Sequence, residues 1–104
     1  MEHILYKNQT SGSYYLVISK GCAYNVCIDI KNNNQRFIDN ETLNSYLNIE
    51  FNKDTVILVL KEIGISDSNI SFSDFQDFNF INYKNNLVKI QSWNDLHNFI
   101  ITIP

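Results

Sequence analysis

The sequence predicts an α+β fold: a single small domain over residues 1–104, with a mostly antiparallel sheet built from hairpins and two or three short helices packed on one face. Three observations lead to this prediction. Residues 14–31 and 80–91 each carry strand-like apolar patterns on both sides of a turn. Three other stretches begin with a capping side chain and continue with apolar residues suited to a helix. No repeat or linker divides the chain.

The N-terminal half is expected to begin with sheet. Residues 3–7 (HILYK) form a short candidate strand, and residues 8–13 (NQTSGS) form a loop. Residues 14–31 give the clearest hairpin, with Lys20-Gly21 at its middle, because both arms are rich in Tyr, Val and Ile. We expect Gly21 to adopt the positive φ angle that a tight hairpin turn demands.

The second arm of this hairpin alternates regularly, so its two faces are distinguishable. One face carries large apolar side chains and is expected to be core: Tyr24, Val26, Ile28 and Ile30. The other face is expected to be at least partly exposed to water and carries Asn25, Cys27 and Asp29.

A further strand and a first helix are expected next. Residues 32–35 (NNNQ) are typical of a turn, and residues 36–38 (RFI) of a short strand. Within residues 39–51, Asp39 or Asn40 is a suitable N-cap. Apolar residues at helical spacing then predict a short helix, and they are Leu43, Tyr46 and Leu47.

The apolar run Val56–Ile63 suits either a buried helix or a buried strand, and periodicity alone does not decide between them. The charged pair Lys61-Glu62 and the capping residues on both sides favour the helix. These capping residues are Asn52 or Asp54 at the start, and Gly64 followed by Ile65 at the end.

A second hairpin and a last helix are expected at the C-terminal end. Residues 80–91 turn around Lys84-Asn85-Asn86, since asparagine tolerates the left-handed conformation of such turns. Ser92 and Asp95 resemble a capping box. One helical stripe follows, made of Trp93, Leu96, Phe99 and Ile100, and the end of the chain extends as a last strand or frays.

The composition restricts the classes of function. A formal net charge of −3 argues against a general nucleic-acid binder, and it places any electrostatic function in a local patch. Cys22 and Cys27 match no zinc or redox spacing, so we expect free thiols and a reducing, cytoplasmic compartment. The N-terminus has no secretion signal, and the longest apolar run, Val56–Leu60, is too short to cross a membrane.

The sequence offers no constellation of residues for catalysis. His3 and His97 are far apart and belong to no metal-binding motif, and the scattered glycines form no phosphate-binding loop. Asp74 and Asp77 would share one helical face, and we interpret them as solvated first-turn acids rather than an acid–base pair. We therefore expect no enzyme activity, no cofactor and no metal.

Residues 62–83 are acidic and aromatic and contain no Lys or Arg. Whether Phe72–Phe80 belongs to the core or to an interface stays open. As a hypothesis, this stretch binds a basic protein partner, because complementary charge speeds encounter and aromatic anchors hold a complex. The partner-binding residues of this hypothesis are Glu62, Asp67, Phe72, Asp74, Phe75 and Asp77.

In size, charge and composition the chain resembles small bacterial immunity proteins, including those of contact-dependent inhibition systems. No residue motif carries this resemblance. It implies a small acidic cytoplasmic inhibitor, monomer or homodimer, that neutralises a cognate basic toxin of the nuclease type by covering its active site. Three alternatives stay open: a phage-type inhibitor of a defence nuclease, a non-catalytic adaptor or oligomeric subunit whose hairpin edges pair with another chain, and a small enzyme with a site assembled by the fold.

Overall fold

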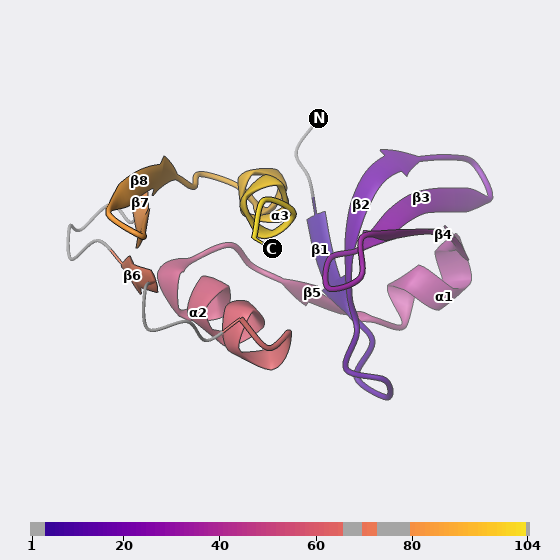
Figure 1. The fold of residues 1–104 in the computed structure, drawn as a ribbon. Coiled ribbons are helices and arrows are strands. Elements are labelled where there is room, and N and C mark those ends of the chain that lie inside the picture. The colour runs from indigo at the N-terminus through magenta and orange to yellow at the C-terminus, as the bar shows by residue number, and fades with distance from the viewer. Residues whose placement is uncertain (1–3, 66–69, 73–79, 104) are drawn as a thin grey trace. The chain divides into compact units, whose positions relative to one another are not determined.

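The predicted α+β class is confirmed, since the described residues form eight β-strands in two antiparallel sheets and three α-helices (Figure 1). The structure is a computed structural model that describes residues 4–65, 70–72 and 80–103. The chain divides into two compact units, Met1–Glu50 and Phe51–Pro104, and each is described by itself. The prediction of a single domain stays a prediction.

The first unit is a five-stranded antiparallel sheet with one short helix, at the indigo-to-magenta end of the colour scale in Figure 1. The strand order is β4-β3-β2-β1-β5. The predicted hairpin of residues 14–31 is confirmed as β2 and β3, with a register shift between Val17 and Ser19. The elements are β1 (Ile4–Lys7), β2 (Tyr14–Lys20), β3 (Tyr24–Asp29), β4 (Asn34–Asp39), α1 (Asn40–Asn44) and β5 (Leu47–Ile49).

The hairpin turn needs glycine for a different reason from the one predicted. The described glycines with a positive φ angle are Gly12 and Gly64, so the prediction for Gly21 is wrong. A Cβ atom at Gly21 would lie 2.5 Å from the carbonyl oxygen of Tyr24. Glycine is required at this position because the backbone of Tyr24 approaches too closely for any side chain.

The two faces of β3 are the reverse of those predicted. Asn25, Cys27 and Asp29 are buried, whereas Tyr24 is 61% exposed and Val26 and Ile28 are only half-buried. Ile30, which follows the strand, is buried as predicted. The reason is the position of α1, which covers the face that carries Cys27. The buried cluster on this face consists of Val17, Cys27, Ile38 and Leu43, with Tyr6, Tyr15 and Tyr46 packed against it.

Helix α1 begins as predicted and ends earlier. Asp39 is the N-cap, and its carboxylate accepts hydrogen bonds from the Thr42 backbone N–H at 3.2 Å and the Thr42 hydroxyl at 2.5 Å. Both hydrogen bonds lower the pKa of the Asp39 carboxyl group, and the bond from the Thr42 hydroxyl has the larger effect. The prediction that Tyr46 and Leu47 belong to the helix is wrong, because α1 ends at Asn44 and Leu47 begins β5, where it pairs with Lys7 of β1.

In the second unit, the ambiguous apolar run forms a helix. Asn52 and Thr55 make a capping box at its start. At its end the Gly64 N–H donates to the Lys61 carbonyl at 3.1 Å, and the Ile65 N–H donates to the Leu60 carbonyl at 2.8 Å. This is the Schellman arrangement, and the φ of +88° at Gly64 confirms the predicted C-terminal cap. The helix is α2 (Lys53–Glu62), with Ile63 as its C-cap.

The C-terminal hairpin and helix are also confirmed. Lys84 and Asn85 both have positive φ angles, as a two-residue hairpin turn requires. Ser92 caps the last helix by accepting from the Asp95 N–H at 3.2 Å, and the predicted apolar stripe is buried. Residues 101–102 form a turn, and no strand follows in the described residues. The elements are β6 (Ile70–Phe72), β7 (Phe80–Tyr83), β8 (Asn86–Lys89) and α3 (Trp93–Ile100), with the strands in that order in a second sheet.

Candidate protein-binding surfaces

The acidic stretch predicted to bind a partner is only partly covered by the structure. Glu62 is the last residue of α2 and is exposed. Phe72 is the last residue of β6, and its side chain is not among those described. The other four predicted contact residues lie outside the described residues, and they are Asp67, Asp74, Phe75 and Asp77. The helical face that Asp74 and Asp77 are expected to share lies outside them as well. The hypothesis for this stretch therefore stays a prediction.

A second surface lies at the edge of the first sheet. In the sheet that the described residues form, β4 has a strand neighbour on one side only. Phe37 of β4 is 69% exposed and lies directly opposite Val26 of β3. Tyr24, two residues before Val26 in β3, lies on the same face of the sheet. We call this region the β4 edge surface and define it by Tyr24, Val26, Gln35, Arg36 and Phe37.

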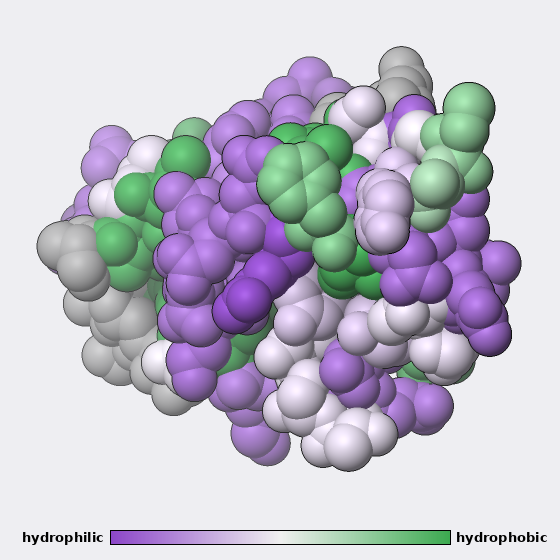
Figure 2. Space-filling model, turned by 90° about the vertical axis from the view of Figure 1, so that its right-hand side faces the viewer, coloured by the Kyte–Doolittle hydropathy of each residue, from purple (hydrophilic) through white to green (hydrophobic). Residues whose placement is uncertain are grey.

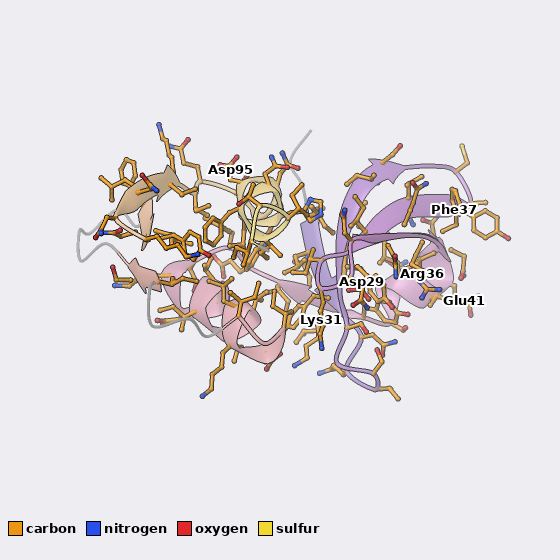
Figure 3. All side chains as sticks on the ribbon, in the orientation of Figure 1. Asp29, Lys31, Arg36, Phe37, Glu41 and Asp95 are labelled. Atoms are coloured by element: carbon orange, nitrogen blue, oxygen red, sulfur yellow. The ribbon has the colours of Figure 1, made fainter. Side chains whose placement is uncertain are left out.

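The figures show how this surface is exposed. Figure 2 views the chain from the side of β4 and α1 and shows apolar side chains, in green, at the surface among hydrophilic ones, in purple. In Figure 3, Phe37 and Arg36 of β4 lie at the same end of the first unit as Glu41 of α1. Arg36 and Glu41 are both exposed. The β4 edge surface therefore combines aromatic side chains with the positive charge of Arg36, and the negative charge of Glu41 lies at the same end of the unit.

The backbone of β4 also offers unused hydrogen-bonding groups. The Asn40 N–H donates to the Ala23 carbonyl at 3.2 Å, in the same register as the β3–β4 pairing. Antiparallel strands bond through every second residue, so Ile38, Arg36 and Asn34 direct their backbone groups toward β3. The N–H and C=O groups of Gln35 and Phe37 then point away from the sheet, at its open edge.

A network of hydrogen bonds around the buried Asn25 holds this end of the sheet in place. The Asn25 side-chain amide donates to the Ile38 carbonyl at 3.2 Å and to Oδ1 of Asn40 at 2.8 Å. The Asn40 side-chain amide in turn donates to the Cys22 carbonyl at 2.9 Å. These bonds join the β2–β3 turn, β4 and the start of α1, so they fix the backbone from which Tyr24 and Phe37 project.

No group of three or more His, Cys, Asp and Glu residues that could hold a metal ion occurs among the described residues. Both cysteines are free thiols, as predicted, with Cys22 exposed and Cys27 buried, and burial raises the pKa of the Cys27 thiol. Within the described part of the chain no helix is long and apolar enough to cross a membrane.

His97 is buried in α3, and burial lowers the pKa of its imidazole below the usual 6.5. Between the folded and the unfolded pKa, the unfolded chain binds more protons, so acidification favours unfolding. We expect the free energy of unfolding to fall as the pH decreases below about 6.5 and to level off below the folded pKa. Urea titrations across this range measure the slope. His97→Gln should abolish it and His3→Asn should not; equal slopes in the wild type and His97→Gln would contradict the assignment.

The β4 edge surface was not predicted. Ile38 packs in the cluster that contains Leu43 of α1, so Phe37, its neighbour along β4, lies on the opposite face. The predicted strand of residues 36–38 was correct in position, but a strand pattern alone does not show which face the following helix covers.

Comparisons of the chain with models of known protein families, with curated proteins and with solved structures gave no match.

Proposed function

We propose that this protein is a small cytoplasmic inhibitor of the immunity type, which binds a basic, nuclease-type bacterial toxin and covers its active site. One observation carries the proposal. Residues 62–83 hold four acids and no base, a formal charge of −4, while the whole chain has a net charge of −3. The negative charge is thus concentrated in one segment, as electrostatic steering toward a basic partner requires.

Glu62 lies at the surface, where a toxin can reach it. Glu62 is exposed and is the last residue of α2, the end of a helix where the dipole favours cations over anions. The charge of Glu62 therefore gains nothing from the dipole of α2. In the proposed complex it is the first of the four acids that face the toxin, followed by Asp67, Asp74 and Asp77, with Phe72 and Phe75 as apolar anchors.

Neutralising these four acids should slow binding to the toxin more than it speeds dissociation. We expect the variant with Glu62→Gln, Asp67→Asn, Asp74→Asn and Asp77→Asn to associate about tenfold or more slowly at low salt, because long-range attraction mainly sets the association rate. Its rate should also depend less on salt concentration. The proposal predicts that a neighbouring gene encodes the toxin, and stopped-flow binding to that gene product measures both quantities.

A matched control separates this segment from net charge. The variant with Glu2→Gln, Glu41→Gln, Glu50→Gln and Asp54→Asn changes the formal charge by the same amount outside residues 62–83. The proposal predicts a much smaller effect on association for this control. Equal effects of the two variants would contradict the segment's role. Failure of the wild type to protect cells that express the neighbouring toxin would contradict the inhibitor function itself.

The same surface chemistry suits a phage-type inhibitor of a defence nuclease, because the partner is again a basic enzyme. Protection assays with the two kinds of nuclease distinguish these alternatives.

A further inference from the structure

We propose that the β4 edge surface binds a second copy of this chain, so that two five-stranded sheets join antiparallel through β4 into one continuous sheet. The inference uses residues of the first unit only, and it does not rest on the proposed inhibitor function. Gln35 and Phe37 supply the open backbone groups, and Tyr24 and Phe37 supply the exposed aromatic surface.

A second copy is a suitable occupant because an antiparallel strand pair can be two-fold symmetric. Each copy then offers the same N–H and C=O groups to the other, and every outward group of Gln35 and Phe37 can find a partner. An isologous contact of this kind closes after two copies and leaves no further β4 edge open.

The open backbone groups restrict the register to a few choices. Only the odd-numbered residues of β4 direct their backbone N–H and C=O groups away from the sheet. In the dimer, an odd-numbered residue of one copy must therefore face an odd-numbered residue of the other. In two registers of this kind, five residues of one β4 strand pair with five residues of the other. One places Arg36 directly opposite Arg36 of the second copy, which is destabilising. The other places Phe37 opposite Phe37 and Gln35 opposite Asp39, which joins two aromatic rings and matches an amide donor with a carboxylate acceptor.

The register centred on Phe37 also matches charges on the opposite face. Arg36 lies opposite Ile38 of the second copy, two residues before α1 of that copy. The first turn of α1 contains the acid Glu41, so a guanidinium of one copy approaches a carboxylate of the other, twice per dimer. The Tyr24 side chains flank the paired Phe37 rings on the other face.

The contact is small, so the dimer should be weak. One five-residue strand pair and four aromatic side chains bury less than a standard protein interface of about 1,600 Å². We expect a dissociation constant of about 10–100 μM. Sedimentation equilibrium at concentrations up to about 1 mM should therefore show a monomer–dimer equilibrium. A chain that stays monomeric throughout this range would overturn the inference.

Removal of the aromatic anchor tests the surface. Phe37→Ser should weaken dimerisation about tenfold or more, because truncation of a central aromatic anchor typically has this effect. Leu87→Ser is the matched control, since Leu87 is 71% exposed on the short edge strand β8 of the other sheet. An equal loss in both variants, or an unchanged dimer in Phe37→Ser, would overturn the assignment to β4. Far-UV circular dichroism verifies that both variants fold.

A cysteine at the two-fold axis tests the register. In a Cys22→Ser background, Phe37→Cys places two thiols on facing residues whose Cα atoms are about 5.5 Å apart, within the range of a disulfide. Mild oxidation should cross-link this variant to a covalent dimer. Gln35→Cys in the same background places the thiols about 13 Å apart and should not cross-link. Cross-linking through residue 35 in preference to residue 37 would overturn this register.

The test also separates a second copy from a different partner. If the wild type is monomeric and Phe37→Ser loses only its binding to the toxin, the edge belongs to the toxin interface and the inference is wrong. If Phe37→Ser is monomeric and still binds the toxin, the inference holds and the inhibitor function is unaffected. A dimeric wild type that binds no toxin contradicts the proposed function alone.

Discussion

Replacement of Asn25 by alanine should reduce the free energy of unfolding by roughly 1–3 kcal/mol, although Asn25 is a polar residue of a strand. Its side chain is 2% exposed and donates to the Ile38 carbonyl and to Asn40 Oδ1. Alanine removes the amide donor from the buried Ile38 carbonyl, and a buried polar group that loses its partner costs about 1–3 kcal/mol. Urea unfolding followed by circular dichroism measures the loss.

Two further variants make this prediction specific. Asn25→Asp should be at least as damaging at neutral pH, because it puts a carboxylate next to the Ile38 carbonyl oxygen, and it should recover as acid protonates that carboxylate. Asn48→Ala replaces an exposed asparagine of β5 and should change the stability by less than about 0.5 kcal/mol. If Asn25→Ala and Asn48→Ala were equally stable, the proposed role of the hydrogen bonds around Asn25 would be contradicted.

The network also explains where the sequence misleads. Alternation along β3 was predicted correctly, but the side that faces the interior was not. A strand pattern ranks faces by apolar content, and by that measure Tyr24, Val26 and Ile28 outweigh Asn25 and Cys27. The structure reverses the ranking because α1 lies over the Cys27 side, and because the polar groups on that side form hydrogen bonds. These are tertiary facts, and no local pattern contains them.

Features that depend on a few neighbouring residues were predictable. The caps at Asp39, Asn52 and Ser92 and the turn at Lys84-Asn85 are local hydrogen-bond and φ-angle requirements, and the structure has them where the sequence indicates them. The end of α1 was not predicted, because Leu47 leaves the helix to pair with β1, which is distant in sequence. The β4 edge surface was missed for the same reason, since its exposure follows from strand order.

Replacement of Trp93 by alanine should have the largest effect in the second unit, a loss of about 3–5 kcal/mol. Trp93 is 4% exposed at the start of α3, and its ring meets Phe51 edge to face with centroids 5.0 Å apart. Alanine removes a large buried side chain and leaves a cavity, whereas Trp93→Phe keeps most of the apolar contact and should lose clearly less. Circular dichroism during urea unfolding compares the two variants, and similar losses for both would contradict the packing argument.

Asn25→Ala and Trp93→Ala together test the predicted single domain, because one residue lies in each unit. If the chain unfolds as one cooperative domain, either substitution shifts one common transition for all backbone amides. If the units unfold separately, Asn25→Ala lowers protection only in residues 4–50 and Trp93→Ala only in the described residues after 50. Hydrogen exchange of single amides during mild denaturation distinguishes the outcomes. The single-domain prediction requires that the hydrogen bonds around Asn25 and the Phe51–Trp93 contact protect the same set of amides. If each substitution lowered the protection of a different set, this prediction would be contradicted.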